Sequence, residues 1–176
     1  MKEDVTTSTT VTRAVETLHS VLTDIGWDAR KDDATEGFVV DFDPPYIPVA
    51  FAYAAIFANL EVFVFYLNFG VAAAADRRDE TARFLTLANS NLMVGNFEID
   101  FEDGLVRFRS SVSFEEMELS DILIRNAILS AMNAVERFAE GVIDVMARGK
   151  SAEQAFSELN CSEGLAGDSS DEATYK

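Results

Sequence analysis

The chain has 176 residues and a formal net charge of -17, from 14 lysines and arginines against 31 aspartates and glutamates. A field of this sign repels phosphate backbones and anionic lipid, so we expect no nucleic acid and no membrane as a partner, and a protein partner whose contacting segment is neutral or basic. The single cysteine, Cys161, and the single histidine, His19, exclude an internal disulfide framework and a zinc site of cysteine and histidine ligands.

The length is sufficient to bury one hydrophobic core, which predicts one folded domain. We expect residues 1–10 to be disordered, residues 11–160 to form a single α+β domain, and residues 161–176 to form a disordered acidic tail. The polar, threonine-rich start carries neither a secretory signal nor a transmembrane span, which favours a cytoplasmic location.

Apolar residues at spacings of three and four predict a first helix from Val11 to Ile25. Gly26 is expected to end this helix in the left-handed conformation, and the charged residues 30–36 are expected to form a loop. Two strands follow, over Phe38–Phe42 and Val49–Phe57. Between them lies a turn that holds all three prolines of the chain.

A third strand, over Leu60–Phe69, is apolar on both of its faces. Because a strand of this kind is usually buried on both sides, we expect two covers for it. The second cover is either a helix of the same chain or the surface of another subunit. The two faces are Val62, Val64 and Tyr66 on one side, and Phe63, Phe65 and Leu67 on the other.

A second helix is predicted over Arg77–Leu92, with Asp76 as its N-cap residue. Acidic residues in its first turn favour the helix dipole. The buried stripe expected on this helix is Phe84, Leu87, Ala88 and Leu92.

Alternating apolar and charged residues over 96–114 predict a β-hairpin with Asp103 and Gly104 as its two turn residues. In this register one face of the hairpin is apolar and the other pairs opposite charges. The expected opposite pairs are Phe101 with Val106, Ile99 with Phe108, Asp100 with Arg107, and Glu98 with Arg109.

The last long helix is predicted over Asp121–Ala147, with Ser120 as its N-cap residue, and a short helix is expected over Ser151–Leu159. The wide apolar face of the long helix indicates that it lies on a sheet. Its principal stripe is Ile124, Ile128, Ala131, Val135, Phe138, Val142 and Val145. Its polar side is Asn126, Ser130, Asn133, Arg137, Glu140 and Asp144.

The pair Asn89 and Asn91, the turn at Asp103-Gly104 and the helix after Ser120 resemble the YbjN family, a bacterial group described as sensory transduction regulators. The chain also looks like class I type III secretion chaperones. The resemblance covers about residues 11–147. It implies an α+β fold with an antiparallel sheet in the order α-β-β-β-α-β-β-α, a homodimer and no catalytic residues.

Residue types that carry chemistry are sparse, and we expect no catalytic residue, no cofactor and no metal. His19 has no oriented partner nearby in sequence, and Asn89 and Asn91 are typical of a helix end. Alternate carboxylates on a strand are typical of the solvated side of a sheet, and their spacing does not fit an EF-hand loop. The carboxylates weighed as oxygen ligands are Asp41, Asp43, Glu98, Asp100, Glu102 and Asp103.

Aromatic residues crowd the two middle strands, more than one apolar sheet face readily buries. Beyond core packing, they are candidates for a dimer interface or a partner-binding surface: Phe51, Tyr53, Phe57, Phe63, Phe65 and Phe69. The first hypothesis is therefore a non-enzymatic protein-protein interaction module, a YbjN-like sensory transduction or stress regulator with a chaperone-like dimeric fold. The alternative is a sensor or carrier of a small apolar ligand, with a pocket lined by Leu129, Met132, Phe97 and Phe108.

Overall fold

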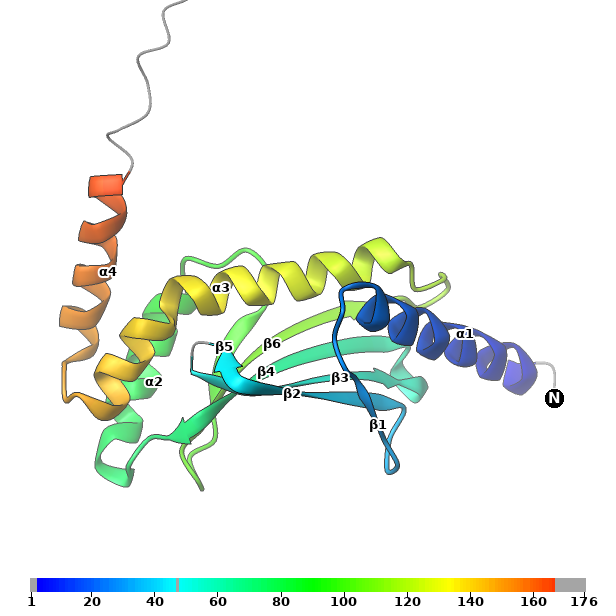
Figure 1. Cartoon of the computed structure of the whole chain (residues 1–176), viewed down its shortest axis with the longest axis horizontal. Helices are drawn as coiled ribbons and strands as arrows, with labels where there is room; N and C mark the ends of the chain where they lie inside the picture. Colours follow the sequence, from blue (N-terminus) through cyan, green and yellow to red (C-terminus); the bar gives the residue numbers. More distant parts are fainter. Residues whose placement is uncertain (1–2, 47, 167–176) are drawn as a thin grey trace, which may run out of the picture.

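In residues 3–46 and 48–166, which this computed structural model describes, six antiparallel strands form one sheet with helices on one of its faces (Figure 1). The strand order is β1-β2-β3-β4-β6-β5. The strands are β1 (Arg30–Asp32), β2 (Gly37–Tyr46), β3 (Val49–Phe57), β4 (Val62–Ala72), β5 (Asn96–Ile99) and β6 (Leu105–Ser113).

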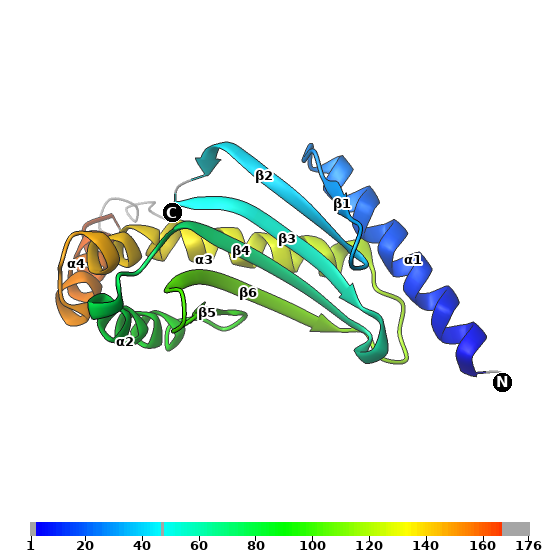
Figure 2. The same cartoon turned by 90° about the horizontal axis from the view of Figure 1, so that it is seen from below.

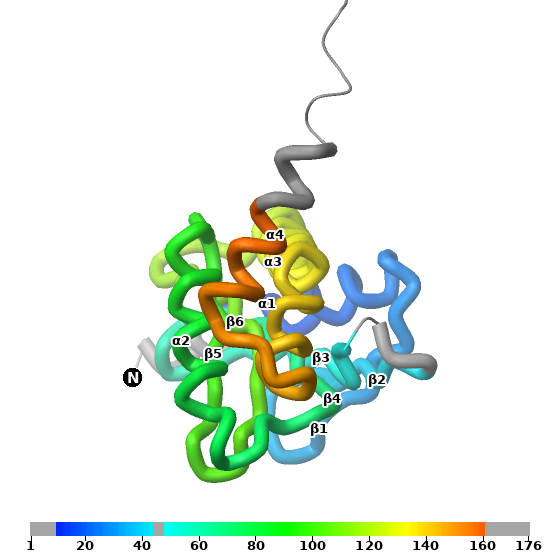
Figure 3. Tube along the Cα trace, turned by 90° about the vertical axis from the view of Figure 1, so that its left-hand side faces the viewer, coloured from blue at the N-terminus to red at the C-terminus, as the bar shows by residue number. Residues whose placement is uncertain are grey.

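The helices are α1 (Glu3–Asp24), α2 (Arg78–Asn89), α3 (Asp121–Ala147) and α4 (Ala152–Ala166), with short 3-10 turns η1 (Ala58–Leu60) and η2 (Ala75–Arg77). α3 runs along the length of the sheet, while α1 lies at one end and α2 and α4 lie at the other (Figure 2). Seen from that second end, α2 and α4 stand in front of α3 (Figure 3). The predicted α+β fold with an antiparallel sheet is confirmed.

α1 begins at Glu3, eight residues before the predicted start at Val11, so residues 3–10 are helical rather than disordered. Extending an existing helix adds one hydrogen bond for each residue fixed, which lets a segment of low helix propensity join it. The predicted end is confirmed, because Gly26 has a φ of 79°. The amide of Trp27 donates to the carbonyl of Leu22 at 3.0 Å, which closes the helix.

β1 lies where a loop was predicted, because residues 30–32 pair with residues 37–39 of β2. These charged residues show no apolar alternation, but charged side chains are common on an edge strand. Asp32 fixes the turn that follows by accepting hydrogen bonds from the amide of Ala34 (3.1 Å) and the hydroxyl of Thr35 (2.8 Å). These hydrogen bonds, first that of Ala34, lower the pKa of Asp32.

β3 has the predicted bounds, whereas β2 continues past the predicted end at Phe42 to Tyr46. β2 therefore includes Pro44 and Pro45, which were expected to interrupt it. The pairing of β2 with β3 is nevertheless irregular between Asp41 and Tyr46. A proline has no amide hydrogen to donate, which accounts for the gap in the ladder.

α2 starts at Arg78 and ends at Asn89, and is shorter at both ends than predicted. Asp76 is not its N-cap residue, because it lies within η2, and Arg77 takes the N-cap position without a side-chain hydrogen bond. The guanidinium of Arg77 instead donates to the carbonyl of Val145 at 2.8 and 3.0 Å, near the end of α3. This long-range contact could not be expected from local sequence.

The β5-β6 hairpin forms where it was predicted, but its register differs by two residues. The turn is residues 100–104 rather than Asp103 and Gly104 alone, because the amide of Gly104 donates to the carbonyl of Asp100 and its carbonyl accepts from the amide of Ala73, both at 2.8 Å. Gly104 lies in the turn, as predicted, and has a positive φ of 81°. The observed pairs are Asn96 with Arg109, Phe97 with Phe108, Glu98 with Arg107, and Ile99 with Val106.

α3 has the predicted bounds, and every residue of its principal stripe is buried against the sheet. Ser120 is its N-cap residue but makes no side-chain hydrogen bond there. Asp144, predicted on the polar side, is buried and forms ion pairs with Arg148 (2.6 Å) and Lys150 (2.7 Å). Burial alone raises the pKa of Asp144, but the hydrogen bonds from Lys150 and Arg148 outweigh it and lower the pKa below its usual value.

α4 extends the short predicted helix, from Ala152 to Ala166. Residues 161–166, expected at the start of a disordered tail, therefore continue a helix, and residues 167–176 of the predicted tail lie outside the described residues. The same holds for residues 1 and 2 of the predicted disordered start.

The hydrophobic core lies between α3 and one face of the sheet, which we call the inner face. Its residues are Phe38, Val40, Ala52, Ala54, Ile56, Phe63, Phe65, Leu67, Phe97, Val106 and Phe108, all buried. One side of β4 thus has the helical cover that the sequence led us to expect.

Candidate interaction surface

The other face of the sheet, which we call the outer face, carries no helix in the described part of the chain (Figure 1). Its side chains stand in rows across the strands, as the register of the ladder requires. The residues of the outer face are Val39, Asp41, Phe51, Tyr53, Ala55, Phe57, Val62, Val64, Tyr66, Asn68, Asn96, Glu98, Arg107, Arg109, Ser111 and Ser113.

The six aromatic residues singled out in the sequence divide between the two faces. Phe63, Phe65 and Phe69 are fully buried, and core packing accounts for them. Phe51 and Phe57 are 37% and 44% exposed on the outer face, where Tyr53 joins them as a partly buried side chain. Only this second group is available to contact another molecule.

Two tyrosines form the centre of the outer face. The rings of Tyr53 and Tyr66 stack with their centroids 6.4 Å apart, and the guanidinium of Arg107 lies 4.7 Å from the centroid of Tyr66. The hydroxyl of Tyr53 donates to Asp32 at 3.2 Å and is also hydrogen-bonded to Thr35. Burial, as the largest cause, raises the pKa of Tyr53, so its hydroxyl is neutral at physiological pH. These contacts hold the ring of Tyr53 in a fixed orientation.

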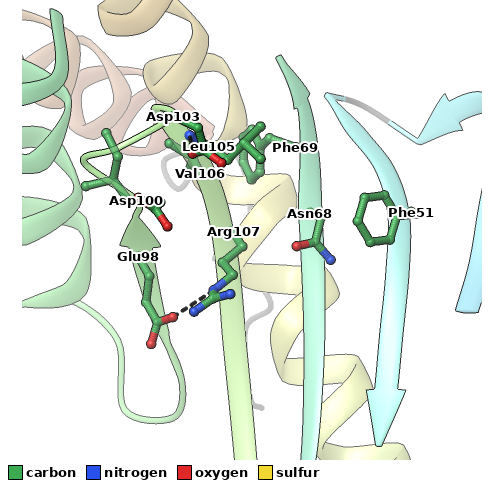
Figure 4. A pocket seen from close by; sticks show the side chains of 10 residues that line it. Phe51, Asn68, Phe69, Glu98, Asp100, Asp103, Leu105, Val106 and Arg107 are labelled. Carbon is green, nitrogen blue, oxygen red and sulfur yellow. Dashed lines mark hydrogen bonds and ion pairs between the residues drawn. The ribbon is translucent and has the colours of Figure 1, made fainter. Parts of the chain in front are cut away.

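A cavity of about 380 Å³ opens at one end of the outer face (Figure 4). It lies where the pairing of β4 with β6 is irregular, since three residues of β4 between Asn68 and Ala72 stand opposite the single residue Val106. Such a bulge interrupts the hydrogen-bonded ladder, so that the two strands separate locally and leave space between them. The lining residues are Phe51, Asn68, Phe69, Glu98, Ile99, Asp100, Asp103, Leu105, Val106 and Arg107.

The charged residues at this cavity are unevenly paired. Glu98 forms ion pairs with Arg107 (2.9 Å) and with Arg109 (3.0 Å), so Arg107 pairs with Glu98 rather than with the predicted Asp100. Asp100 and Asp103 each accept a backbone hydrogen bond within the hairpin turn, at 2.7 and 2.8 Å. The cavity is therefore lined by three carboxylates and one guanidinium.

Asn89 closes the free edge of the sheet at β5, a role that sequence reasoning missed. Its side-chain carbonyl accepts from the amide of Phe97 at 2.7 Å, and its side-chain amide donates to the carbonyl of Phe97 at 3.1 Å. The carboxamide thus takes the place of a neighbouring strand and protects the edge from pairing with another chain. Asn91 instead donates to the carbonyl of Leu87 at the end of α2, as expected for a helix end.

Replacing Asn89 by alanine is expected to lower the free energy of unfolding by about 1 to 3 kcal/mol, because it leaves two buried backbone groups of Phe97 without a partner. Asn91→Ala, at an exposed position, serves as the control and should change stability by about 0.5 kcal/mol or less. Urea titration followed by circular dichroism measures both. Equal losses in the two variants would contradict the edge-closing role.

The residues considered for an apolar ligand lie in different environments. The rings of Phe97 and Phe108 pack edge to face at 4.9 Å within the core, whereas Leu129 is 58% exposed on α3. The ring of His19 stacks on that of Phe38 with the centroids 5.2 Å apart.

Among the described residues, no group of three or more histidine, cysteine, aspartate or glutamate side chains is arranged to hold a metal ion. Within the same residues, none of the helices combines the length and the apolar character needed to cross a membrane.

The chain is thus an α+β protein, with an antiparallel sheet that carries helices on one face and exposes aromatic side chains on the other. A family model, described as "Putative bacterial sensory transduction regulator", matches residues 14–144. The chain belongs to the YbjN family, which confirms the resemblance noted in its sequence.

Solved structures that align with this chain have little sequence identity to it. The crystal structure of YbjN, described as a putative transcription regulator from E. coli, aligns with a TM-score of 0.56 and 10% identity, over 85% of this chain and 92% of that one. The crystal structure of the ExsC-ExsE complex contains a chain that aligns with a TM-score of 0.49 and 13% identity, over 73% of this chain and 92% of that one. A search of curated proteins found no match.

Proposed function

We propose that this chain is a non-enzymatic interaction module that acts as a homodimer and regulates or chaperones another protein. The observation that carries the proposal is the outer face of the sheet, whose aromatic side chains have no helical cover in the described residues. The description of the YbjN family as sensory transduction regulators agrees with a regulatory role. The proposal includes the cytoplasmic location that was expected from the sequence.

The composition of the outer face supports a protein contact. An antiparallel sheet can leave one face in water. Apolar and polar residues then alternate along each strand, and the polar ones lie on the solvated face. Here the middle strands place the exposed Phe57 and the partly buried Tyr53, Val62 and Tyr66 on that face instead, around the buried Val64. Aromatic residues at a surface are typical of the centre of protein-protein interfaces, where they lose little conformational entropy on binding.

A second copy of the chain is the proposed occupant of the Phe57 end of this face. A twofold axis would place this patch of one copy on the same patch of the other, so that the side chains at the axis contact their counterparts and Phe57, Val62 and Tyr66 share one interface. Two sheets packed face to face bury such rows in one layer. The rings are already held in place by the stack of Tyr53 on Tyr66, which lowers the ordering cost of association.

Replacing Phe57 by serine tests this proposal. We expect the dimer of the unmodified chain, measured by light scattering over a dilution series, to dissociate at a concentration at least about tenfold higher in the Phe57→Ser variant. Leu129→Ser is the matched control, because it removes a similarly exposed apolar side chain from α3. A monomeric unmodified chain, or equal weakening by the two variants, would overturn the dimer.

A further inference from the structure

The cavity at the other end of the outer face combines apolar and acidic lining residues. The ligand inferred from them deepens the interaction function proposed above and rests on it. The buried Phe69 and Val106 line its interior, and the exposed Phe51 and Leu105 stand at its margin. The volume of about 380 Å³ lies at the small end of ligand pockets, which measure about 300 to 1,000 Å³. The apolar part of this lining suits the methylene stem of a side chain.

The charges at the margin favour a cation at the end of that stem. Glu98 is already paired with Arg107 and Arg109. Asp100 and Asp103, in contrast, form no ion pair in the part of the chain that the structure describes. Their backbone hydrogen bonds fix both carboxylates in the hairpin turn before any ligand arrives, so little ordering is required on binding.

The arrangement of the carboxylates favours a guanidinium over a metal ion. A bare metal ion is disfavoured, because no three acidic side chains of the described residues converge on one point. A guanidinium offers five donors in a planar fork and binds two carboxylates at once, and its weak hydration lowers the cost of entering a half-buried site. The net charge of -17 adds a long-range attraction for basic segments.

We propose that this cavity binds an arginine side chain from a segment of a partner protein in which arginine alternates with apolar residues. Asp100 and Asp103 pair with the guanidinium, the stem lies over Phe69 and Val106, and the neighbouring apolar side chains of the segment contact Phe51 and Leu105. Alternation suits the site because successive side chains of an extended segment point to opposite sides. The partner thus adds a cation to a cavity whose own guanidinium, that of Arg107, is already paired with Glu98.

The test uses a fluorescently labelled heptapeptide that alternates leucine with arginine, and a second heptapeptide in which citrulline replaces arginine. Citrulline keeps the shape of the side chain and removes its charge. We expect the arginine peptide to bind the full chain, by fluorescence anisotropy, at least about tenfold more tightly than the citrulline peptide. The difference should shrink at high salt, and the amide NMR signals of Leu105 and Arg107 should shift on binding.

Variants of the cavity make the test specific. Asp100→Asn with Asp103→Asn keeps the oxygen atoms that accept the backbone hydrogen bonds and removes both charges, so the turn is retained while the arginine peptide should bind at least about tenfold more weakly. The control, Glu16→Gln with Glu136→Gln, removes two charges from exposed positions on α1 and α3 and should leave the affinity within about twofold.

Several outcomes would overturn the proposal. These are no binding of the arginine peptide, equal binding of the citrulline peptide, an undiminished affinity in the cavity variant, or tight binding of free spermidine that displaces the peptide. The dimer measurement on Phe57→Ser is independent of all of these results. Failure of the peptide experiments with a confirmed dimer interface would therefore refute the arginine site alone, whereas a monomeric unmodified chain would refute the proposed function on which the site rests.

Discussion

Replacing Phe138 by alanine is expected to lower the free energy of unfolding by about 3 to 5 kcal/mol, because the change leaves a cavity in the centre of the core. Phe138 is only 1% exposed. Its ring lies 6.1 Å from that of Phe97 on β5 and 6.5 Å from that of Phe156 on α4, between centroids. It therefore joins the sheet, α3 and α4, and none of the three can move without disturbing the others. Urea titration followed by circular dichroism measures the loss.

Phe101→Ala is the matched control for this prediction. The chemical change is the same, but Phe101 is 55% exposed in the hairpin turn, so less apolar area returns to water on unfolding the native protein. We expect a loss of about 1 kcal/mol or less. A loss below about 1 kcal/mol for Phe138→Ala itself would mean that the principal stripe of α3 does not lie in the core.

Replacing Gly104 by valine is expected to lower the free energy of unfolding by about 2 to 5 kcal/mol, from backbone strain and from steric overlap together. The φ of 81° is unfavourable for a β-branched residue. A Cβ atom at this position would also lie 2.2 Å from the carbonyl oxygen of Ala73, which belongs to the backbone and cannot turn away. Thermal and urea unfolding measure the loss.

Gly149→Val separates these two causes. Gly149 has a φ of 76°, close to that of Gly104, but a Cβ atom there meets nothing within 4 Å. This control therefore carries the backbone strain alone, at about 1 to 2 kcal/mol. If the two glycine variants lost the same stability, the close approach of Ala73 to the hairpin turn would be contradicted.

The sequence predicted best those elements whose periodicity is long and regular. α3 and β3 have the predicted bounds because their apolar pattern repeats along the whole element, over 27 residues in α3. Short or polar elements were missed for the opposite reason. β1 is three charged residues on an edge, and the first residues of α1 are polar, so neither carries an apolar pattern.

The hairpin shows how a correct face pattern can accompany a wrong register. A shift of two residues leaves each strand residue on the same face, so the sequence alternation is satisfied by either pairing. What distinguishes them is remote in sequence: Ala73 hydrogen-bonds to Gly104, and Asn89 to Phe97. The same limit applied to the polar side of α3, where ion pairs with Arg148 and Lys150 bury Asp144.

The sequence by itself therefore determined the α+β class, the antiparallel hairpin, the long helix on the sheet and an excess of aromatic residues in the middle strands, because each follows from local periodicity or composition. Only the tertiary structure decided which aromatic residues are buried, since both faces of β4 are apolar and the position of α3 selects one of them. The cavity beside Asp100 and Asp103 likewise exists only because β4 bulges away from β6, a property of strand pairing rather than of either strand.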